Sequence, residues 1–231
     1  VRRSARIGVA VILVGALLFF AALAGLSAFR DFLAGSEDAQ ASTEALMAQR
    51  LEVLADHRGQ VLAGFLLVAV GELLLGVGMW VIATGVSRAE SGWRAGAASA
   101  AAWSCLVGAG LALAVQAWPT MWLGDDRGVA ELGLAGTTST LLVIAWVLLS
   151  AGFLACAVVL VTGGRWPIWP GVVLAVFGLL PLVTKLPLFF QVGAVVAGVG
   201  LARSGGGRPE RRRGEPEATG ASRRRSPGAD A

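Results

Sequence analysis

Long apolar stretches that are nearly free of charge alternate along the chain with short segments that hold most of the charged residues. The apolar stretches cover residues 7–29, 59–86, 95–118, 136–162 and 168–202. A helix needs about 20 mainly apolar residues to cross the hydrocarbon core of a bilayer, and each stretch reaches that length. The pattern therefore predicts an all-α protein, a polytopic bundle of transmembrane helices.

The last apolar stretch is too long for one span. Its 35 residues would form a helix of about 52 Å, against a hydrocarbon core of about 30 Å. Pro181, Lys185 and Pro187 lie near its middle, where Pro removes a backbone donor and Lys is the one charge in the stretch. We predict two spans here, over 168–184 and 187–202, and six spans in all. The alternative is five spans, with the last stretch forming one long helix broken inside the membrane.

The composition excludes an ordinary soluble domain. Of the 231 residues, 56% are hydrophobic and 15% are charged, whereas about a quarter of residues are charged in soluble domains. Cys105 and Cys156 lie in different stretches without paired spacing, which predicts neither a zinc site nor a disulfide framework. Arg2, Arg3 and Arg6 precede the first stretch, as in a secretory signal. The stretch is longer than a signal core, however, and this favours a retained first span.

The distribution of Arg predicts the topology, because Lys and Arg in short loops favour the cytoplasmic side. Arg exceeds the acidic residues before the first stretch, in 87–94 and in 163–167, whereas acids exceed Arg in 30–58 and 119–135. The tail from residue 203 onward holds eight Arg. We therefore predict a multi-pass protein of the plasma (inner) membrane with both termini in the cytoplasm. Five spans would instead leave the tail outside.

Residues 203–231 form a compositionally distinct tail after the membrane domain of residues 1–202. The tail has no Leu, Ile, Val or Phe to bury, which predicts a disordered, Arg-rich cytoplasmic segment. Its Arg clusters either bind anionic lipid or only enforce the topology. Nucleic acid is not expected as a partner, because no aromatic residue lies among the Arg. The candidate lipid contacts are Arg211, Arg212, Arg213, Arg223, Arg224 and Arg225.

Glu72 is the one acidic residue well inside an apolar stretch. A carboxylate near the middle of a bilayer costs several kcal/mol if it is ionised and unpaired. We therefore expect Glu72 to be protonated, paired across the bundle, or in contact with water. Lys185, Gln116 and Gln191 are the other candidate polar residues inside the membrane. Together with the Thr-rich run at 137–140 they either line a polar vestibule above Glu72 or make ordinary hydrogen bonds between helices.

Residues 41–57 predict an amphipathic helix on the outer side, with Met47, Leu51 and Leu54 at helical spacing. Such a helix serves either as a lid or partner-binding surface, or as an interfacial helix that lies on lipid headgroups. His57 follows it. It is the only histidine of the chain, and its isolation favours a solvated loop residue over a proton sensor or a metal ligand.

No catalytic, nucleotide or metal motif is present, so we expect no cofactor and no metal. The turn with Trp166-Pro167 and Trp169-Pro170 is similar to turns in multi-span bacterial families of unknown function, a resemblance that implies no activity. A non-enzymatic sensing, scaffolding or regulatory role is the first hypothesis. Proton- or cation-coupled transport through Glu72 is the second, and an intramembrane enzyme is the third. A homo-oligomer or a membrane-protein partner is compatible with each.

Overall fold

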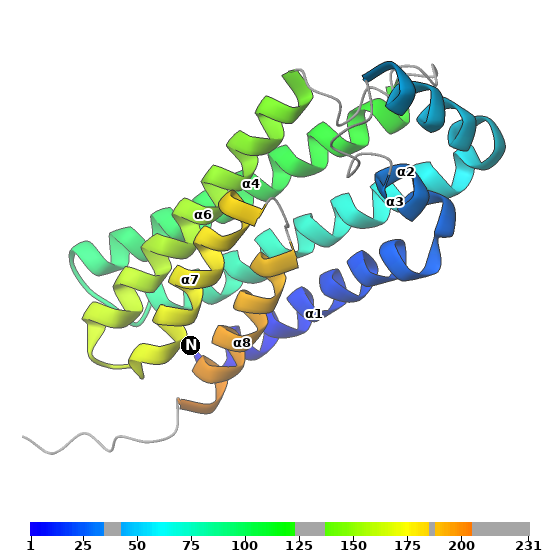
Figure 1. The fold of residues 1–231 in the computed structure, drawn as a ribbon. Coiled ribbons are helices and arrows are strands. Elements are labelled where there is room, and N and C mark those ends of the chain that lie inside the picture. Colours follow the sequence, from blue (N-terminus) through cyan, green and yellow to red (C-terminus); the bar gives the residue numbers. More distant parts are fainter. Residues whose placement is uncertain (35–42, 123–136, 185–187, 205–231) are drawn as a thin grey trace, which may run out of the picture.

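The computed structural model describes residues 1–34, 43–122, 137–184 and 188–204, and within these ranges every element is an α-helix (Figure 1). The all-α prediction is confirmed. The helices are α1 (Arg2–Gly25), α2 (Ser27–Ala34), α3 (Thr43–Ser87), α4 (Trp93–Trp122), α6 (Thr137–Gly163), α7 (Ile168–Thr184) and α8 (Leu188–Ser204).

Four of these helices, α1, α3, α4 and α6, are long and apolar enough to cross a membrane. Helices α7 and α8 are also apolar but have 17 residues each, which corresponds to about 26 Å. The last apolar stretch is therefore divided between two helices, and α7 continues through Pro181 before it ends at Thr184. Lys185 lies outside the described residues.

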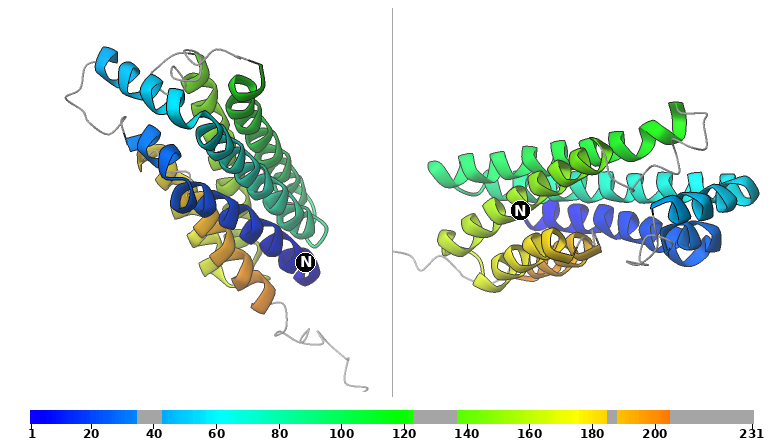
Figure 2. Two further views of the ribbon diagram at one scale, coloured as in Figure 1. Left: turned by 90° about the vertical axis from the view of Figure 1, so that its right-hand side faces the viewer. Right: turned by 45° about the horizontal axis from the view of Figure 1, so that its top comes forward.

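The six longer helices form a closed ring in chain order. Each contacts the next, from α1 through α3, α4, α6 and α7 to α8, and α8 returns to contact α1 (Figures 1 and 2). Consecutive helices are antiparallel, so the N-terminus and the end of α8 lie at the same end of the bundle. We call it the basic end, because the described residues there include several Arg but a single acid, Glu90. The Arg residues are Arg3, Arg6, Arg88, Arg94, Arg165 and Arg203.

The surface of the ring is apolar. Large hydrophobic side chains are exposed along α1, α6, α7 and α8, with Leu17 at 68% and Val183 at 82% exposure. The interior is built mainly from small and medium apolar residues, among them Ala98, Ala109 and Cys105, which are fully buried. An apolar exterior around a packed interior is the arrangement expected of a helical bundle surrounded by lipid. It is compatible with a membrane location.

Glycines set the approach of α1 to α3. Gly8 faces Gly78, and a Cβ placed on either one would lie 2.6–2.7 Å from the carbonyl oxygen of the other. One heptad further along each helix, Gly15 and Gly71 face each other in the same way, with distances of 2.7 and 2.8 Å. The two backbones therefore touch, as small residues allow in membrane helices.

The structure corrects the predicted first span. The stretch over residues 7–29 is not one helix, because α1 ends at Gly25 and Leu26 is extended (φ −114°, ψ 92°) before α2 begins. Ser27 is the one polar residue beside the bend and the residues around it are apolar, so hydropathy alone did not mark it. Gly25, a poor helix former, is the last residue of α1 before the bend.

Helix α2 and residues 43–57 of α3 form a cap at the end opposite the basic end, and a kink at His57 separates the cap from the rest of α3. The apolar face predicted for residues 41–57 packs on α2, where Leu54 and Phe32 are buried together. The Arg50 guanidinium lies over the Phe32 ring at 5.0 Å. Leu54 of this apolar face is thus covered by the chain itself, while Met47 and Leu51 are only partly buried. The predicted lid or interfacial role of the helix stays a prediction. His57 is exposed.

Candidate functional site

The candidate site is the buried carboxyl of Glu72 near the middle of α3. Gly71 faces α1 at the close backbone contact. Because successive residues of a helix are turned by about 100°, the next side chain points away from α1 and into the ring. Glu72 is only 2% exposed there. Its position therefore follows from the glycine contact beside it.

Three helices meet at this carboxyl. Gln116 of α4 donates a hydrogen bond from Nε2 to Glu72 Oε2 over 2.6 Å, and Gln116 is itself 8% exposed. The indole of Trp146 on α6 lies near the carboxyl, but its N–H has no hydrogen-bond partner among the described residues. The other oxygen, Glu72 Oε1, has no hydrogen-bond partner among the described residues.

The remaining predicted polar residues are not joined to Glu72 by a hydrogen bond in the described part of the chain. Gln191 on α8 is 1% exposed, and neither of its amide atoms has a hydrogen-bond partner there. Ser150 on α6 is also buried, with its hydroxyl unpartnered among the described residues. One hydrogen bond, between Glu72 and Gln116, joins two of the predicted residues, and the polar vestibule stays a prediction. Lys185 lies outside the described residues, as do the side chains at 137–139.

The arrangement favours hydrogen bonding over ion binding. The groups that face the carboxyl from the described residues are an amide and an indole, and both are neutral donors. An ionised carboxylate in an apolar interior needs a cation or several donors to offset the cost of desolvation. No group of three His, Cys, Asp or Glu side chains that could hold a metal is found among the described residues.

Trp146 was not among the site residues predicted from the sequence. Most Trp residues of the chain lie near the ends of apolar stretches, as expected for side chains at a membrane interface. Trp146 lies well inside α6, and a Trp in such a place needs a partner for its N–H. Its position inside an apolar stretch is a sequence signal that could have pointed to a polar group in the interior.

The predicted lipid contacts of the tail, at residues 211–213 and 223–225, lie outside the described residues. Comparison with known protein families, characterised proteins and solved structures finds no match to this chain.

Proposed function

We propose that the chain is a six-span integral protein of the plasma membrane with both termini in the cytoplasm. The alternating direction of the six ring helices supports this topology, because it brings every described segment with excess Arg to the same end of the bundle. Helices α7 and α8 then serve as two short spans, at about 26 Å each, with the local bilayer thinned around them.

Labelling of single cysteines with a membrane-impermeant reagent tests the topology. Cys105 and Cys156 are buried and are first replaced by Ala. New cysteines then replace Lys185 and Ser204, one at a time. Labelling from outside at position 185 with protection at 204 is expected. The reverse result would mean five spans and a tail outside the cell.

Within this topology the protein has a non-enzymatic role in sensing, scaffolding or regulation. The observation that carries this proposal is the enclosure of the polar interior. Glu72, Gln116, Ser150 and Gln191 are each at most 8% exposed, so none meets a substrate in the closed ring. Glu72 then serves as a hydrogen-bonding group that joins α3 to α4.

Transport coupled to a proton or cation is the second candidate. One observation favours it, since Glu72 Oε1 is buried without a hydrogen-bond partner among the described residues and is available to take up a proton. Buried intramembrane acids often belong to proton pathways. This function requires a second conformation in which water reaches Glu72.

Proton flux into liposomes separates the two functions. The purified full chain and the Glu72→Gln variant are reconstituted with a pH-sensitive dye inside, and an outside-acid gradient is imposed. The structural role predicts the same slow leak for both proteins. Flux in the wild type that disappears in Glu72→Gln, with the variant still folded, would overturn it in favour of transport.

A further inference from the structure

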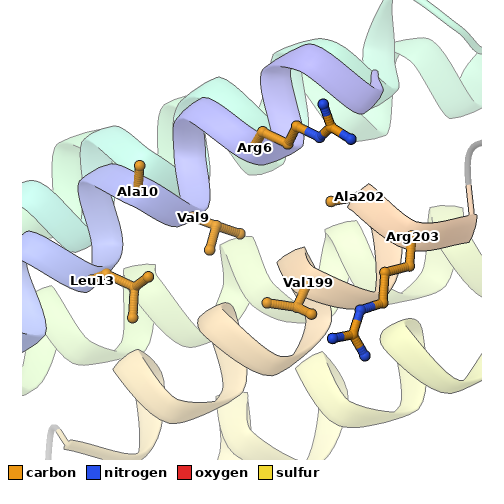
Figure 3. A pocket seen from close by; sticks show the side chains of 7 residues that line it. All are labelled: Arg6, Val9, Ala10, Leu13, Val199, Ala202 and Arg203. Atoms are coloured by element: carbon orange, nitrogen blue, oxygen red, sulfur yellow. The ribbon is translucent and has the colours of Figure 1, made fainter.

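An open groove of about 360 Å³ lies between the first and the last helix of the ring, at the basic end (Figure 3). It forms where α1 and α8 close the ring. Gly198 lets the helices approach there, since a Cβ on it would lie 2.3 Å from Val9 Cγ2. The lining residues are Arg6, Val9, Ala10 and Leu13 of α1 and Val199, Ala202 and Arg203 of α8.

The groove is polar at one end and apolar along the rest. Figure 3 shows Arg6 and Arg203 towards one end of it and Leu13 towards the other. Both charged lining residues are cations, and neither has an ion pair with an acid among the described residues. Two Arg side chains from different helices thus lie at the same end of the groove, with no acid among its lining residues.

We infer that this groove binds one anionic phospholipid, with the phosphate between Arg6 and Arg203 and an acyl chain along Val9, Leu13 and Val199. Guanidinium groups bind phosphate through paired, charge-assisted hydrogen bonds. From Arg6 to Leu13 the groove follows α1 for about 10 Å, which leads from the headgroup layer into the hydrocarbon. Exposed apolar residues, including Leu17 and Phe20, continue the same helix beyond the groove.

This inference rests on the membrane placement proposed above, but it concerns a different site from Glu72 and different residues from the tail. The bound lipid would contact both α1 and α8, and so would join the two helices at which the ring closes. Its binding would stabilise that contact by mass action. The chemistry selects anionic over zwitterionic lipids, because two cations and no acid line the groove.

Native mass spectrometry of the purified full chain in a neutral detergent tests the site. The probe is an equal mixture of phosphatidylglycerol and phosphatidylcholine. We expect the wild type to retain the anionic lipid with about tenfold preference. The double variant Arg6→Gln/Arg203→Gln should lose most of that preference. The matched control Arg3→Gln/Arg88→Gln removes the same charge from the basic end outside the groove and should keep it.

Three results would overturn the inference. Equal loss in both double variants would mean general attraction to a basic surface. Unchanged preference in the groove variant would place the lipid elsewhere. Displacement of the lipid by inorganic phosphate would mean a site for a free anion. Circular dichroism and the elution volume check that both variants are folded. Because the measurement is made in detergent, it does not depend on the topology or on the role of Glu72.

Discussion

The two faces of α3 are held to their neighbours by opposite means. Towards α1, Gly71 and Gly78 contact glycines backbone to backbone, with Ile12 and Ile82 packed beside the contact. Towards α4, the next residue, Glu72, reaches Gln116 through a side-chain hydrogen bond. The first contact depends on shape and tolerates no added atom, whereas the second depends on matched polar groups and tolerates a substitute of similar chemistry. Neighbouring residues of one helix therefore differ in which mutations they accept.

The largest effect is expected from an added methyl group at the glycine contact. Gly71→Ala places a Cβ 2.8 Å from the Gly15 carbonyl oxygen, and only a shift of the backbone can relieve that clash. We expect a loss of about 2 kcal/mol in the free energy of unfolding. Titration of the protein with SDS in mixed micelles, followed by circular dichroism, measures it.

Gly110→Ala on α4 is the matched control. A Cβ at Gly110 meets nothing within 4 Å, and Ala is the better helix former by about 1 kcal/mol. The control is expected to be neutral or stabilising. If the two variants lost equal stability, close approach would not be what holds α1 to α3.

The polar contact gives the second largest effect. Glu72→Ala leaves the Gln116 amide buried without its acceptor, and we expect a loss of about 1.5 kcal/mol in the free energy of unfolding. Glu72→Gln keeps an oxygen of the same shape at the same place, so a loss of less than about 1 kcal/mol is expected. The same titration in SDS compares the two variants.

A double-mutant cycle sharpens this result. Replacing both partners, in Glu72→Leu/Gln116→Leu, removes the donor together with the acceptor and leaves neither unsatisfied. The double variant is therefore expected to lose less stability than the two single changes added together, by at least about 0.6 kcal/mol. Additive losses would mean that the two side chains act independently.

The sequence predicted much of the fold and only part of the site, and particular residues explain the difference. Apolar runs located the long helices because the bilayer imposes a length on each of them. The bend at Leu26 was missed because a single serine, Ser27, does not interrupt an apolar stretch enough to mark it. Glu72 and Gln116 were both singled out as polar residues in apolar stretches. The two residues are 44 positions apart in sequence, however, and their contact depends on the register of α3 against α4.

Other features depend on the closed ring and could not be read from any one segment. Arg6 and Arg203 lie near opposite ends of the described chain, and only the contact of α8 with α1 brings them to one groove. The pairing of Gly8 with Gly78 similarly requires the register of two helices. Hydropathy reports which residues avoid water, and that property is the same for residues facing lipid and residues facing a neighbour.

The smallest effects are expected from two serines. Ser104 donates from its hydroxyl to the Leu148 carbonyl oxygen over 2.6 Å, so Ser104→Ala should cost about 0.6 kcal/mol of unfolding free energy. The hydroxyl of Ser150 is buried without a partner among the described residues, so Ser150→Ala should be neutral or slightly stabilising. Thermal unfolding in detergent compares both with the wild type. The opposite order would mean that Ser150, and not Ser104, joins two helices.

The closure of α8 onto α1 also sets an order of events during biosynthesis. The ribosome makes α1 before α8, and translation at roughly 5 to 20 residues per second separates them by roughly 8 to 33 seconds. During that interval the face of α1 that carries Val9 cannot pack on α8, and it contacts lipid or the insertion machinery instead. The ring can therefore close only after α8 has left the ribosome, and a nascent chain that stops after α7 would leave this side of α1 open.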